Sequence, residues 1–531
     1  MVLSTVQEAK VQLAEFRNQA LTDFSSDQKR QAMEQALAKV RAELGREYDL
    51  VIGTERIRCD RKLESCNPSR PSEVVGVFQK ATEPLVQKAV AAAETAFQTW
   101  RQKTPEERVS LLLKLSQIMQ ERRLELAAWM VVEVGKPWTE ADADVAEAID
   151  FCEFYAREAL RLGGPQDLTP ADGEENHLYY IPLGVGVIIP PWNFPLAILT
   201  GMTTAAVVTG NTAIVKPSSD SPTIAAKLMQ IVEKAGFPPG VVNFLTGSGA
   251  EVGDVLVAHP RVRFIAFTGS KEVGLRINEL AAKVPPGQVW IKRAILEMGG
   301  KDAIIVDSES NLDEAAAGVV TSAFGFQGQK CSACSRAIVL EPVYDAFLDK
   351  LREAMGRTIR EGNVEDGRVN FGPVINARAC ESILEYIRIG QKEGRLIVGG
   401  SRAPGEGYFI RPTVIADVDS KARIAQEEIF GPVLAVIRAR DYDHALEIAN
   451  DTQYGLTGAV YTDNREKQVE AERRFHVGNL YLNRKCTGAL VGAHPFGGFN
   501  MSGTDSKAGG KDYLLLFTQA KAISRKLRPL R

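Results

Sequence analysis

The chain has 531 residues, of which 45% are hydrophobic and 25% charged, and its formal net charge at pH 7 is −3. This length exceeds what a single hydrophobic core supports, so we expect two or three domains. The near-neutral charge gives no electrostatic reason to expect a nucleic acid or an anionic membrane as partner. Seven cysteines without a regular framework, and a first stretch of twenty residues without an apolar signal core, predict a cytoplasmic protein with reduced thiols.

The N-terminal third is predicted to be mainly helical. Residues 1–45 are charged and carry apolar residues at helical spacing, which indicates a helical extension. Residues 48–57 have the pattern of a pair of strands. Long amphipathic helices follow between residues 83 and 162.

A stretch without charged side chains, residues 178–215, is long enough to cross a bilayer. It is broken in the middle by Pro190, Pro191 and Asn193, whose freed backbone groups would stay unsatisfied in lipid. A buried protein crevice can satisfy them. We therefore interpret the stretch as two buried elements that meet at a sharp turn.

From residue 179 onward, short apolar runs alternate with helical patterns, which predicts a parallel sheet covered on both faces. A second region of the same kind extends from residue 303 to about 480, and the last stretch, 513–531, begins apolar and ends basic, as in a docking tail. No internal repeat or low-complexity linker separates these regions, so interleaved domains are expected. The predicted strands of the first region are residues 185–189, 213–216, 241–245 and 264–267, with a helix at 222–235.

Two glycine turns follow strands of this first region. Gly249 belongs to the turn after residues 241–245, and Gly269 with Ser270 forms the turn after residues 264–267. Such turns let a backbone approach a phosphate at a helix N-terminus, although neither spells the full dinucleotide fingerprint and each is also compatible with an ordinary strand-to-helix turn. Lys216 ends a strand, where it could bond a ribose or lie on the surface.

Cys331 follows a run rich in glycine, and Glu297 lies 34 residues upstream in a glycine-flanked run of its own. A thiol on a glycine turn with a carboxylate as base is the equipment of covalent catalysis at a carbonyl. Both residues also have structural interpretations, as a small buried hydrophobe and an exposed turn acid. Cys334 completes a Cys-x-x-Cys spacing, but the five histidines are scattered, so no metal site is expected.

An ordered series of motifs extends through most of the chain and resembles the aldehyde dehydrogenase superfamily from about residue 48 onward. Narrower features resemble the bacterial branch that oxidises L-glutamate γ-semialdehyde, formed from 1-pyrroline-5-carboxylate, to L-glutamate in proline degradation. These features are the N-terminal extension, residues 325–333 and residues 483–492. The ordered motifs are Pro191-Trp192-Asn193-Phe194-Pro195, Lys216-Pro217-Ser218, Phe267-Thr268-Gly269-Ser270, Glu297-Met298-Gly299-Gly300-Lys301, Gly328-Gln329-Lys330-Cys331, Glu428-Ile429-Phe430-Gly431-Pro432, Pro495-Phe496-Gly497-Gly498 and Ser502-Gly503.

The resemblance implies an α/β fold with a Rossmann-type cofactor domain, an α/β catalytic domain and a small oligomerisation element. The corresponding boundaries in this sequence are a helical extension at 1–47, an NAD-binding domain at 48–168 and 184–297, a catalytic domain at 298–494, and oligomerisation elements at 169–183 and 495–531. A homo-oligomer, dimeric or larger, is expected, and a proline dehydrogenase is a possible partner.

The resemblance also assigns catalytic roles. Cys331 would attack the aldehyde as a thiolate, and Asn193 with the backbone N–H of Cys331 would stabilise the oxyanion. Hydride transfer would leave a thioester, which water activated by Glu297 would hydrolyse. Cys334 is not required by this scheme. It is interpreted as a small core residue, with a reversible disulfide to Cys331 as the alternative hypothesis.

The resemblance assigns further residues to the cofactor and to the substrate. Ser219 stands where many NAD-specific relatives carry Glu, so some use of NADP beside NAD is expected. Phe194, Ser332, Gly488 and Ala489 would contact the small-molecule substrate, the last three at its α-carboxylate. The residues assigned to the cofactor are Trp192, Lys216, Ser219, Gly249, Gly269, Ser270, Glu428 and Phe430.

Three alternatives remain at this point. The nearest is another semialdehyde or amino-aldehyde dehydrogenase with the same chemistry. A relative that transfers the acyl group to coenzyme A is disfavoured, because Glu297 supplies a hydrolytic base. A non-catalytic protein on the same scaffold would have no need of Cys331, Glu297 and Asn193 together.

Overall fold

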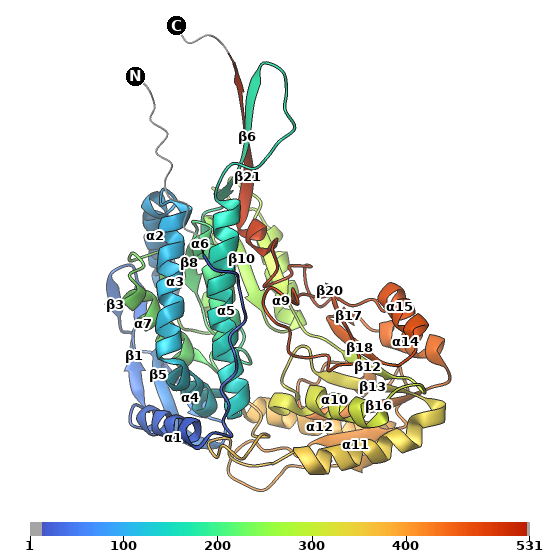
Figure 1. The fold of residues 1–531 in the computed structure, drawn as a ribbon. Helices are drawn as coiled ribbons and strands as arrows, with labels where there is room; N and C mark the ends of the chain where they lie inside the picture. The colour runs from blue at the N-terminus through green and yellow to red at the C-terminus, as the bar shows by residue number, and fades with distance from the viewer. Residues whose placement is uncertain (1–12, 528–531) are drawn as a thin grey trace.

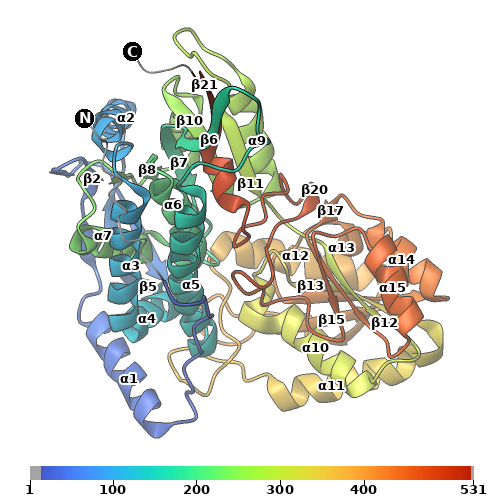
Figure 2. The same ribbon diagram turned by 45° about the horizontal axis from the view of Figure 1, so that its top comes forward.

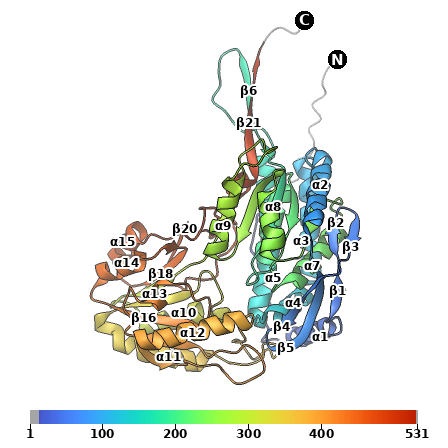
Figure 3. The same cartoon turned by 180° about the vertical axis from the view of Figure 1, so that it is seen from behind.

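The computed structural model describes residues 13–527. Within that range the chain forms two α/β units, each built around a seven-stranded sheet, and a two-stranded ribbon that projects from the first unit (Figure 1). Figures 2 and 3 show the two units side by side, with the N-terminal half of the chain in one and most of the C-terminal half in the other.

The first sheet has the strand order β11-β10-β7-β8-β9-β2-β3. The strands from β11 to β9 run parallel, whereas β2 and β3 are antiparallel at one edge. All strands predicted for this region are present within two residues, and β11, whose short run contains a charge, is additional. The bounds are β2 (Leu50–Ile52), β3 (Glu55–Ile57), β7 (Val185–Ile189), β8 (Thr212–Val215), β9 (Val242–Phe244), β10 (Val262–Thr268) and β11 (Arg293–Glu297).

Both faces of this sheet are buried, as the continuous apolar runs predict. Successive residues of β7 enter different cores, Val187 on one face and Ile188 on the other. α2 (Glu83–Trp100), α8 (Asp254–Ala258) and α9 (Lys271–Ala282) cover the Val187 face. The Ile188 face is covered by α6 (Ala197–Val208) and α7 (Pro222–Ala235), and then by an outer layer of α3 (Pro105–Glu121), α4 (Arg123–Val134) and α5 (Trp138–Leu162).

The second sheet has the order β14-β15-β16-β13-β12-β18-β19 and is parallel except at β14. Its two faces again pack against separate helical layers. The strands are β12 (Asp302–Val306), β13 (Cys334–Leu340), β14 (Arg395–Val398), β15 (Thr413–Ala416), β16 (Val433–Ala439), β18 (Thr457–Tyr461) and β19 (Asn479–Leu482). One face carries α10 (Leu312–Phe324) and α11 (Tyr344–Thr358), and the other carries α12 (Ala377–Glu393), α13 (Arg423–Gln426), α14 (Tyr442–Asn450) and α15 (Arg465–Arg474).

The projecting ribbon pairs β6 (Glu174–Pro182) with β21 (Thr518–Lys526) in antiparallel register, which joins segments far apart in the sequence (Figure 1). The 3-10 turn Tyr513–Phe517, just before β21, packs into the core of the first unit. Residues Phe499–Asn500 (β20) pair instead with Tyr454–Gly455 (β17) of the second unit. The described part of this segment, residues 495–527, therefore touches both units as well as forming one strand of the ribbon.

The N-terminal extension is less helical than predicted. Among the described residues before β1 (Arg46–Tyr48), only α1 (Asp27–Arg41) is an α-helix, and residues 1–12 lie outside the described range. Two carboxylates of α5 hold the preceding segment in an irregular path. Asp150 accepts hydrogen bonds from the Gln19 backbone (2.8 Å) and the Asn18 amide, and Asp142 accepts one from the Thr22 backbone (2.7 Å). These tertiary bonds replace helical ones.

The uncharged stretch 178–215 contains the end of β6, β7, a turn, the 12-residue α6 and β8. Along residues 13–527, none of the helices is long and apolar enough to span a bilayer. A third, smaller sheet beside α4 and α7 consists of β1 (Arg46–Tyr48), β4 (Lys62–Asn67) and β5 (Arg70–Gln79).

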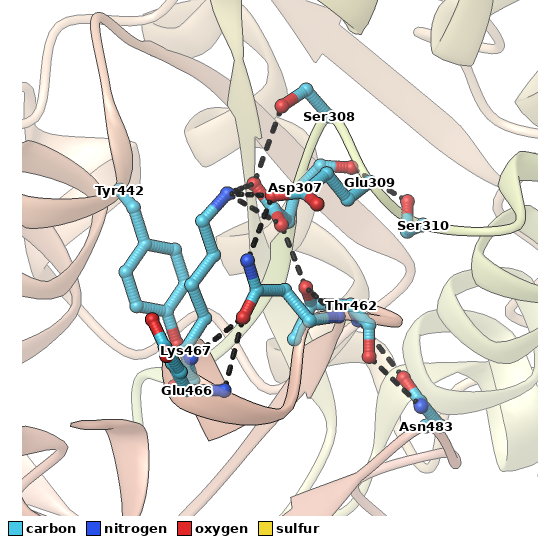
Figure 4. A network of polar contacts seen from close by, with 10 residues as sticks. Asp307, Ser308, Glu309, Ser310, Tyr442, Thr462, Glu466, Lys467 and Asn483 are labelled. Carbon is cyan, nitrogen blue, oxygen red and sulfur yellow. Dashed lines mark hydrogen bonds and ion pairs between the residues drawn. The ribbon is translucent and has the colours of Figure 1, made fainter. Parts of the chain in front are cut away.

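A buried polar network ties together the carboxyl ends of β12 and β18 (Figure 4). The fully buried carboxylate of Asp307 accepts hydrogen bonds from Lys467 (2.8 and 2.9 Å) and from the Thr462 hydroxyl (2.6 Å). Lys467 also reaches the exposed Glu309 at 2.8 Å. The Thr462 backbone forms two bonds with the side chain of Asn483, the residue that follows β19.

We predict that Asp307→Ala destabilises the fold by about 3 kcal/mol, because it leaves the partly buried Lys467 ammonium and the Thr462 hydroxyl without their acceptor. The midpoint of thermal or urea unfolding measures the loss. Glu309→Ala is the matched control, since it removes an exposed partner of the same lysine and should cost less than about 1 kcal/mol. Equal effects of the two substitutions would contradict the assigned importance of Asp307.

Candidate active site

Cys331 lies in a strained loop between α10 and β13. Phe326 (φ 49°) and Gln327 (φ 57°) adopt the left-handed backbone region, which is costly for residues with a side chain. A Cβ at Gly328 would overlap the carbonyl oxygen of Gly431, so this position requires glycine. The amide side chain of Gln329 accepts a hydrogen bond from the Ile375 backbone (2.9 Å), which helps to hold the strained path.

Cys331 is half-buried as a residue, and three carboxyl groups lie near its thiol. Burial first, and then the charges of Asp302, Glu428 and Glu297, raise the pKa of this thiol well above the usual value. These surroundings favour the neutral thiol over the thiolate. The expected attack as a thiolate therefore requires that this proton leave when the aldehyde is in place.

Asn193 is brought directly to the Cys331 loop. It lies in the turn between β7 and α6, is 4% exposed, and its Nδ2 donates to the carbonyl oxygen of Gln329 at 3.0 Å. An amide nitrogen carries two hydrogens, so the second N–H remains for another acceptor. The sharp turn predicted within residues 178–215 thus places the amide donor of Asn193 next to the loop that carries Cys331.

Glu297 ends β11 and begins a turn that packs on the same loop. A Cβ at Gly300 in this turn would overlap the carbonyl oxygen of Cys331, so the two backbones are in contact. One oxygen of the Glu297 carboxyl accepts from the Ser506 hydroxyl, and the other has no partner among the described residues. Burial raises the pKa of Glu297 to about 8. The sequence did not predict a role for Ser506. The only signals near it were the family motifs at residues 495–498 and 502–503.

Three of the residues assigned to the cofactor lie close together. Trp192 packs edge-to-face on Phe430, with ring centroids 5.5 Å apart, and on Phe326 at 6.4 Å. Glu428 accepts a hydrogen bond from the Gly300 backbone at 3.0 Å, and burial raises its pKa to about 7. These side chains come from both units and enclose one side of the Cys331 loop.

The remaining cofactor candidates follow the carboxyl ends of the parallel strands β8, β9 and β10, where α/β proteins bind nucleotides. Lys216 is 6% exposed, its Nζ bonds only the Pro217 carbonyl oxygen (3.1 Å), and burial lowers its pKa to about 8. Gly249 begins a π-helical turn, and Ser270 caps α9 next to Gly269. Ser219 is exposed in a turn after β8.

This edge of the sheet fits a dinucleotide. A buried lysine with a single backbone partner has free donors for ribose hydroxyls, and the N-terminal turn of α9 offers N–H groups to a phosphate. The nearby Gly249 turn is unobstructed, since a Cβ there would meet no neighbouring atom. By contrast, residues 13–527 contain no cluster of His, Cys, Asp and Glu with the arrangement of a metal site.

The residues predicted to contact the substrate come from three segments of the chain. Phe194 lies under the ammonium of Lys136, 4.0 Å from the ring centroid, and Lys330 approaches the same ring at 6.0 Å. Ser332 is buried, and Gly488 (φ 76°) lies beside Ala489 in a loop after β19. The sequence did not single out the two lysines, which cluster here only through the fold.

Cys334 points away from the solvent. It is 1% exposed, forms part of the core under the second sheet, and its thiol donates to the carbonyl oxygen of Arg336 at 3.4 Å. All seven cysteines are free thiols. The interpretation of Cys334 as a small core residue agrees with this burial, and the disulfide hypothesis stays a prediction.

The sequence profile of the aldehyde dehydrogenase family matches residues 57–523, and the chain belongs to that family. It is 56% identical over 509 residues to 1-pyrroline-5-carboxylate dehydrogenase of Geobacillus thermodenitrificans, covering 96% of this chain and 99% of that protein. Its fold matches the crystal structure of 1-pyrroline-5-carboxylate dehydrogenase from Thermus with bound NAD, with a TM-score of 0.95, 53% identity, and coverage of 97% and 100% of the two chains. Proline utilization A from Bdellovibrio bacteriovorus matches with a TM-score of 0.95 at 46% identity, and covers 97% of this chain and 54% of that one.

We predict that iodoacetamide modifies Cys331 slowly at neutral pH and faster as the pH rises above 9, because only the thiolate reacts and the pKa of this thiol is raised. Glu428→Gln removes one nearby negative charge and should increase the rate at pH 9. Glu427→Gln, which alters a carboxylate bonded to Arg423, should leave it unchanged. Peptide mass spectrometry separates Cys331 from the exposed Cys66. Fast, pH-independent labelling of Cys331 at pH 7 would contradict the prediction.

Proposed function

We propose that the protein oxidises L-glutamate γ-semialdehyde, formed from 1-pyrroline-5-carboxylate, to L-glutamate with NAD, as the second step of proline degradation. The observation that carries the proposal is the meeting of Cys331, Asn193 and Glu297 around one loop. The similarity to 1-pyrroline-5-carboxylate dehydrogenases along nearly the whole chain supports the substrate. Another semialdehyde or amino-aldehyde dehydrogenase is the second candidate, because it would use the same three residues.

In the proposed mechanism, Cys331 adds to the aldehyde carbon. The free N–H of Asn193 and the backbone N–H of Cys331 donate hydrogen bonds to the developing oxyanion, and each such donor stabilises the transition state by about 3 kcal/mol. The strained loop holds the sulfur and the backbone donor in one geometry before the substrate binds. Bound NAD supplies the hydride acceptor, and the acyl group remains on Cys331 as a thioester.

Glu297 then activates water for hydrolysis of the thioester. Because burial raises its pKa to about 8, the Glu297 carboxylate is a stronger base than an exposed carboxylate. This pKa also lies close to neutral pH, where a general base is most effective. The Glu297 oxygen without a partner is available for the attacking water molecule. No histidine is needed in this scheme.

For the cofactor, we assign Lys216 to the adenosine ribose, Gly249, Gly269 and Ser270 to the pyrophosphate region, and Glu428 to the nicotinamide ribose. Trp192 and Phe430 would enclose the nicotinamide, consistent with their packing at 5.5 Å. The exposed Ser219 carries no negative charge, so a 2′-phosphate would meet no repulsion from it and NADP would also be accepted.

For the substrate, we assign Phe194 to the aliphatic chain, and Ser332, Gly488 and Ala489 to the α-carboxylate. Lys136 and Lys330, both near the Phe194 ring, add positive charge on this side. We further propose that the β6–β21 ribbon joins copies of the chain into a dimer or larger assembly in the cytoplasm. The match to proline utilization A supports a proline dehydrogenase as the source of the intermediate.

The first test compares kcat/KM for 1-pyrroline-5-carboxylate, succinate semialdehyde and an uncharged aldehyde of similar length. We expect a preference of about a hundredfold for the first, which corresponds to about 2.7 kcal/mol of differential transition-state binding. Formation of NADH gives the rates. Activity without a preference would support the proposed mechanism but favour another semialdehyde or amino-aldehyde as the substrate. No activity with any aldehyde would refute the proposal.

A second test separates the two halves of the mechanism. Glu297→Gln keeps the size of the side chain but removes the base, so we expect a burst of NADH followed by turnover slowed about a hundredfold or more. Cys331→Ala should abolish both phases. Stopped-flow measurement resolves the burst. An equal loss of burst and turnover in Glu297→Gln would show that Glu297 acts before the thioester forms.

A further inference from the structure

The loop at residues 484–492 is exposed at its tip but firmly held at its base. Gly488 is exposed, whereas Cys486, two residues earlier, is completely buried. Such a loop can present its backbone to a ligand at a defined place only if its base is fixed relative to the rest of the site.

We propose that Asn483 and Cys486 are positioning residues that set the distance between this loop and the nucleophile, and that this distance selects aldehydes bearing a carboxylate. The inference rests on the proposed function, since it takes the loop as the binding site of the substrate carboxylate. Neither residue touches the substrate in this account. Both act through the backbone that they hold.

Asn483 forms the first anchor. It has a left-handed backbone (φ 50°), which asparagine tolerates better than most residues and which turns the chain away from β19. Its side chain accepts from the Thr462 N–H at 2.9 Å and donates to the Thr462 carbonyl oxygen at 3.0 Å. Thr462 is in turn bonded to the buried Asp307, as Figure 4 shows, so the start of the loop is fixed to the end of β12.

Cys486 forms the second anchor and connects the loop directly to the neighbour of the nucleophile. Its backbone N–H donates to the Ser322 hydroxyl of α10 at 3.2 Å. Its thiol donates to the carbonyl oxygen of Ser332 at 3.4 Å, and Ser332 follows Cys331 in the chain. One side chain therefore spans the two loops that would hold the two ends of the substrate.

Arg484 shapes the tip between the anchors. Its guanidinium lies over the Tyr481 ring at 4.3 Å and donates to the carbonyl oxygens of Thr487 and Gly488, both at 3.2 Å. Along residues 13–527, no side chain or backbone oxygen accepts the N–H of Gly488 or Ala489. At the tip, the carbonyl oxygens of Thr487 and Gly488 are thus occupied and two adjacent N–H donors are free, which suits a carboxylate.

The two anchors make a specific demand on the substrate. An aldehyde that carries a carboxylate must reach Cys331 and the N–H donors at once, so a shift of the loop misplaces one end. An aldehyde without a carboxylate uses only the Cys331 end and is insensitive to the loop. A displacement of about 1 Å can cost a hundredfold in rate when both ends must align.

The experiment compares Cys486→Ala, Cys486→Ser and Asn483→Gly, using the full-length protein with NAD. For the first and third variants we expect kcat/KM with 1-pyrroline-5-carboxylate to fall about tenfold, mainly through KM, while propanal oxidation stays within about twofold of the wild type. Cys486→Ser retains a donor for the Ser332 carbonyl and should largely restore the preference. Asn483→Gly keeps the left-handed backbone and removes only the amide.

Cys152→Ala is the matched control, because Cys152 is an equally buried cysteine, on α5, with no part in either anchor. It should leave the ratio of the two substrates unchanged. An equal loss with both aldehydes, or an unchanged ratio in all three variants, would overturn the inference. A wild-type enzyme without any preference would instead refute the proposed substrate. If Cys486→Ala fails to fold, Cys486→Ser and Asn483→Gly still give the ratio.

Discussion

The site depends on close contact between three backbone segments that only glycine permits. A side chain at Gly300 would collide with the Cys331 carbonyl, one at Gly299 with the Glu428 carboxylate, and one at Gly328 with the Gly431 carbonyl. The turn after Glu297, the loop of Cys331 and the segment around Glu428 therefore approach one another closely at these glycines, twice through backbone carbonyls and once through the Glu428 carboxylate. Because a side chain at any of the three glycines would collide with its neighbour, the segments can pack this closely only with glycine there. The fixed positions of Cys331 and Glu297 follow from this constraint.

The same packing determines the protonation of the site. Glu297 and Glu428 both lie in poorly solvated surroundings, so burial raises their pKa values to about 8 and about 7, and burial also raises the pKa of the Cys331 thiol. For Glu297 the folded-state pKa exceeds the ordinary value of 4.5, so its ionisation costs folding free energy as the pH rises from about 4.5 towards 8. The same raised pKa that costs this folding free energy makes the Glu297 carboxylate basic enough to accept a proton near neutral pH.

Much of this arrangement could be predicted from the sequence, because it depends on local patterns. Apolar runs predicted β7 and α7 with their observed bounds, and parallel strands bring their carboxyl ends to one edge of the sheet, which places Lys216 and Ser270 at that edge. The irregular path before Asp27 could not be predicted, since it is held by carboxylates of α5 more than a hundred residues away. The hydrogen bond from Ser506 to Glu297 and the one from the Cys486 thiol to the Ser332 carbonyl oxygen could not be predicted either, because each joins residues far apart in the sequence.

Within residues 13–527, three buried polar atoms without a partner lie in the connection between the two units. Glu297 Oε2, Lys301 Nζ and Asp302 Oδ2 are buried without a hydrogen-bond partner among the described residues, and all three lie in the short connection between β11 and the start of β12. Folded proteins rarely leave such groups unpaired, because each costs free energy. A connection chosen only for stability would replace them with apolar or paired residues. Their presence beside Glu297, the proposed base, is consistent with a local sequence that serves the proposed reaction, while the two flanking cores supply the stability that this segment lacks.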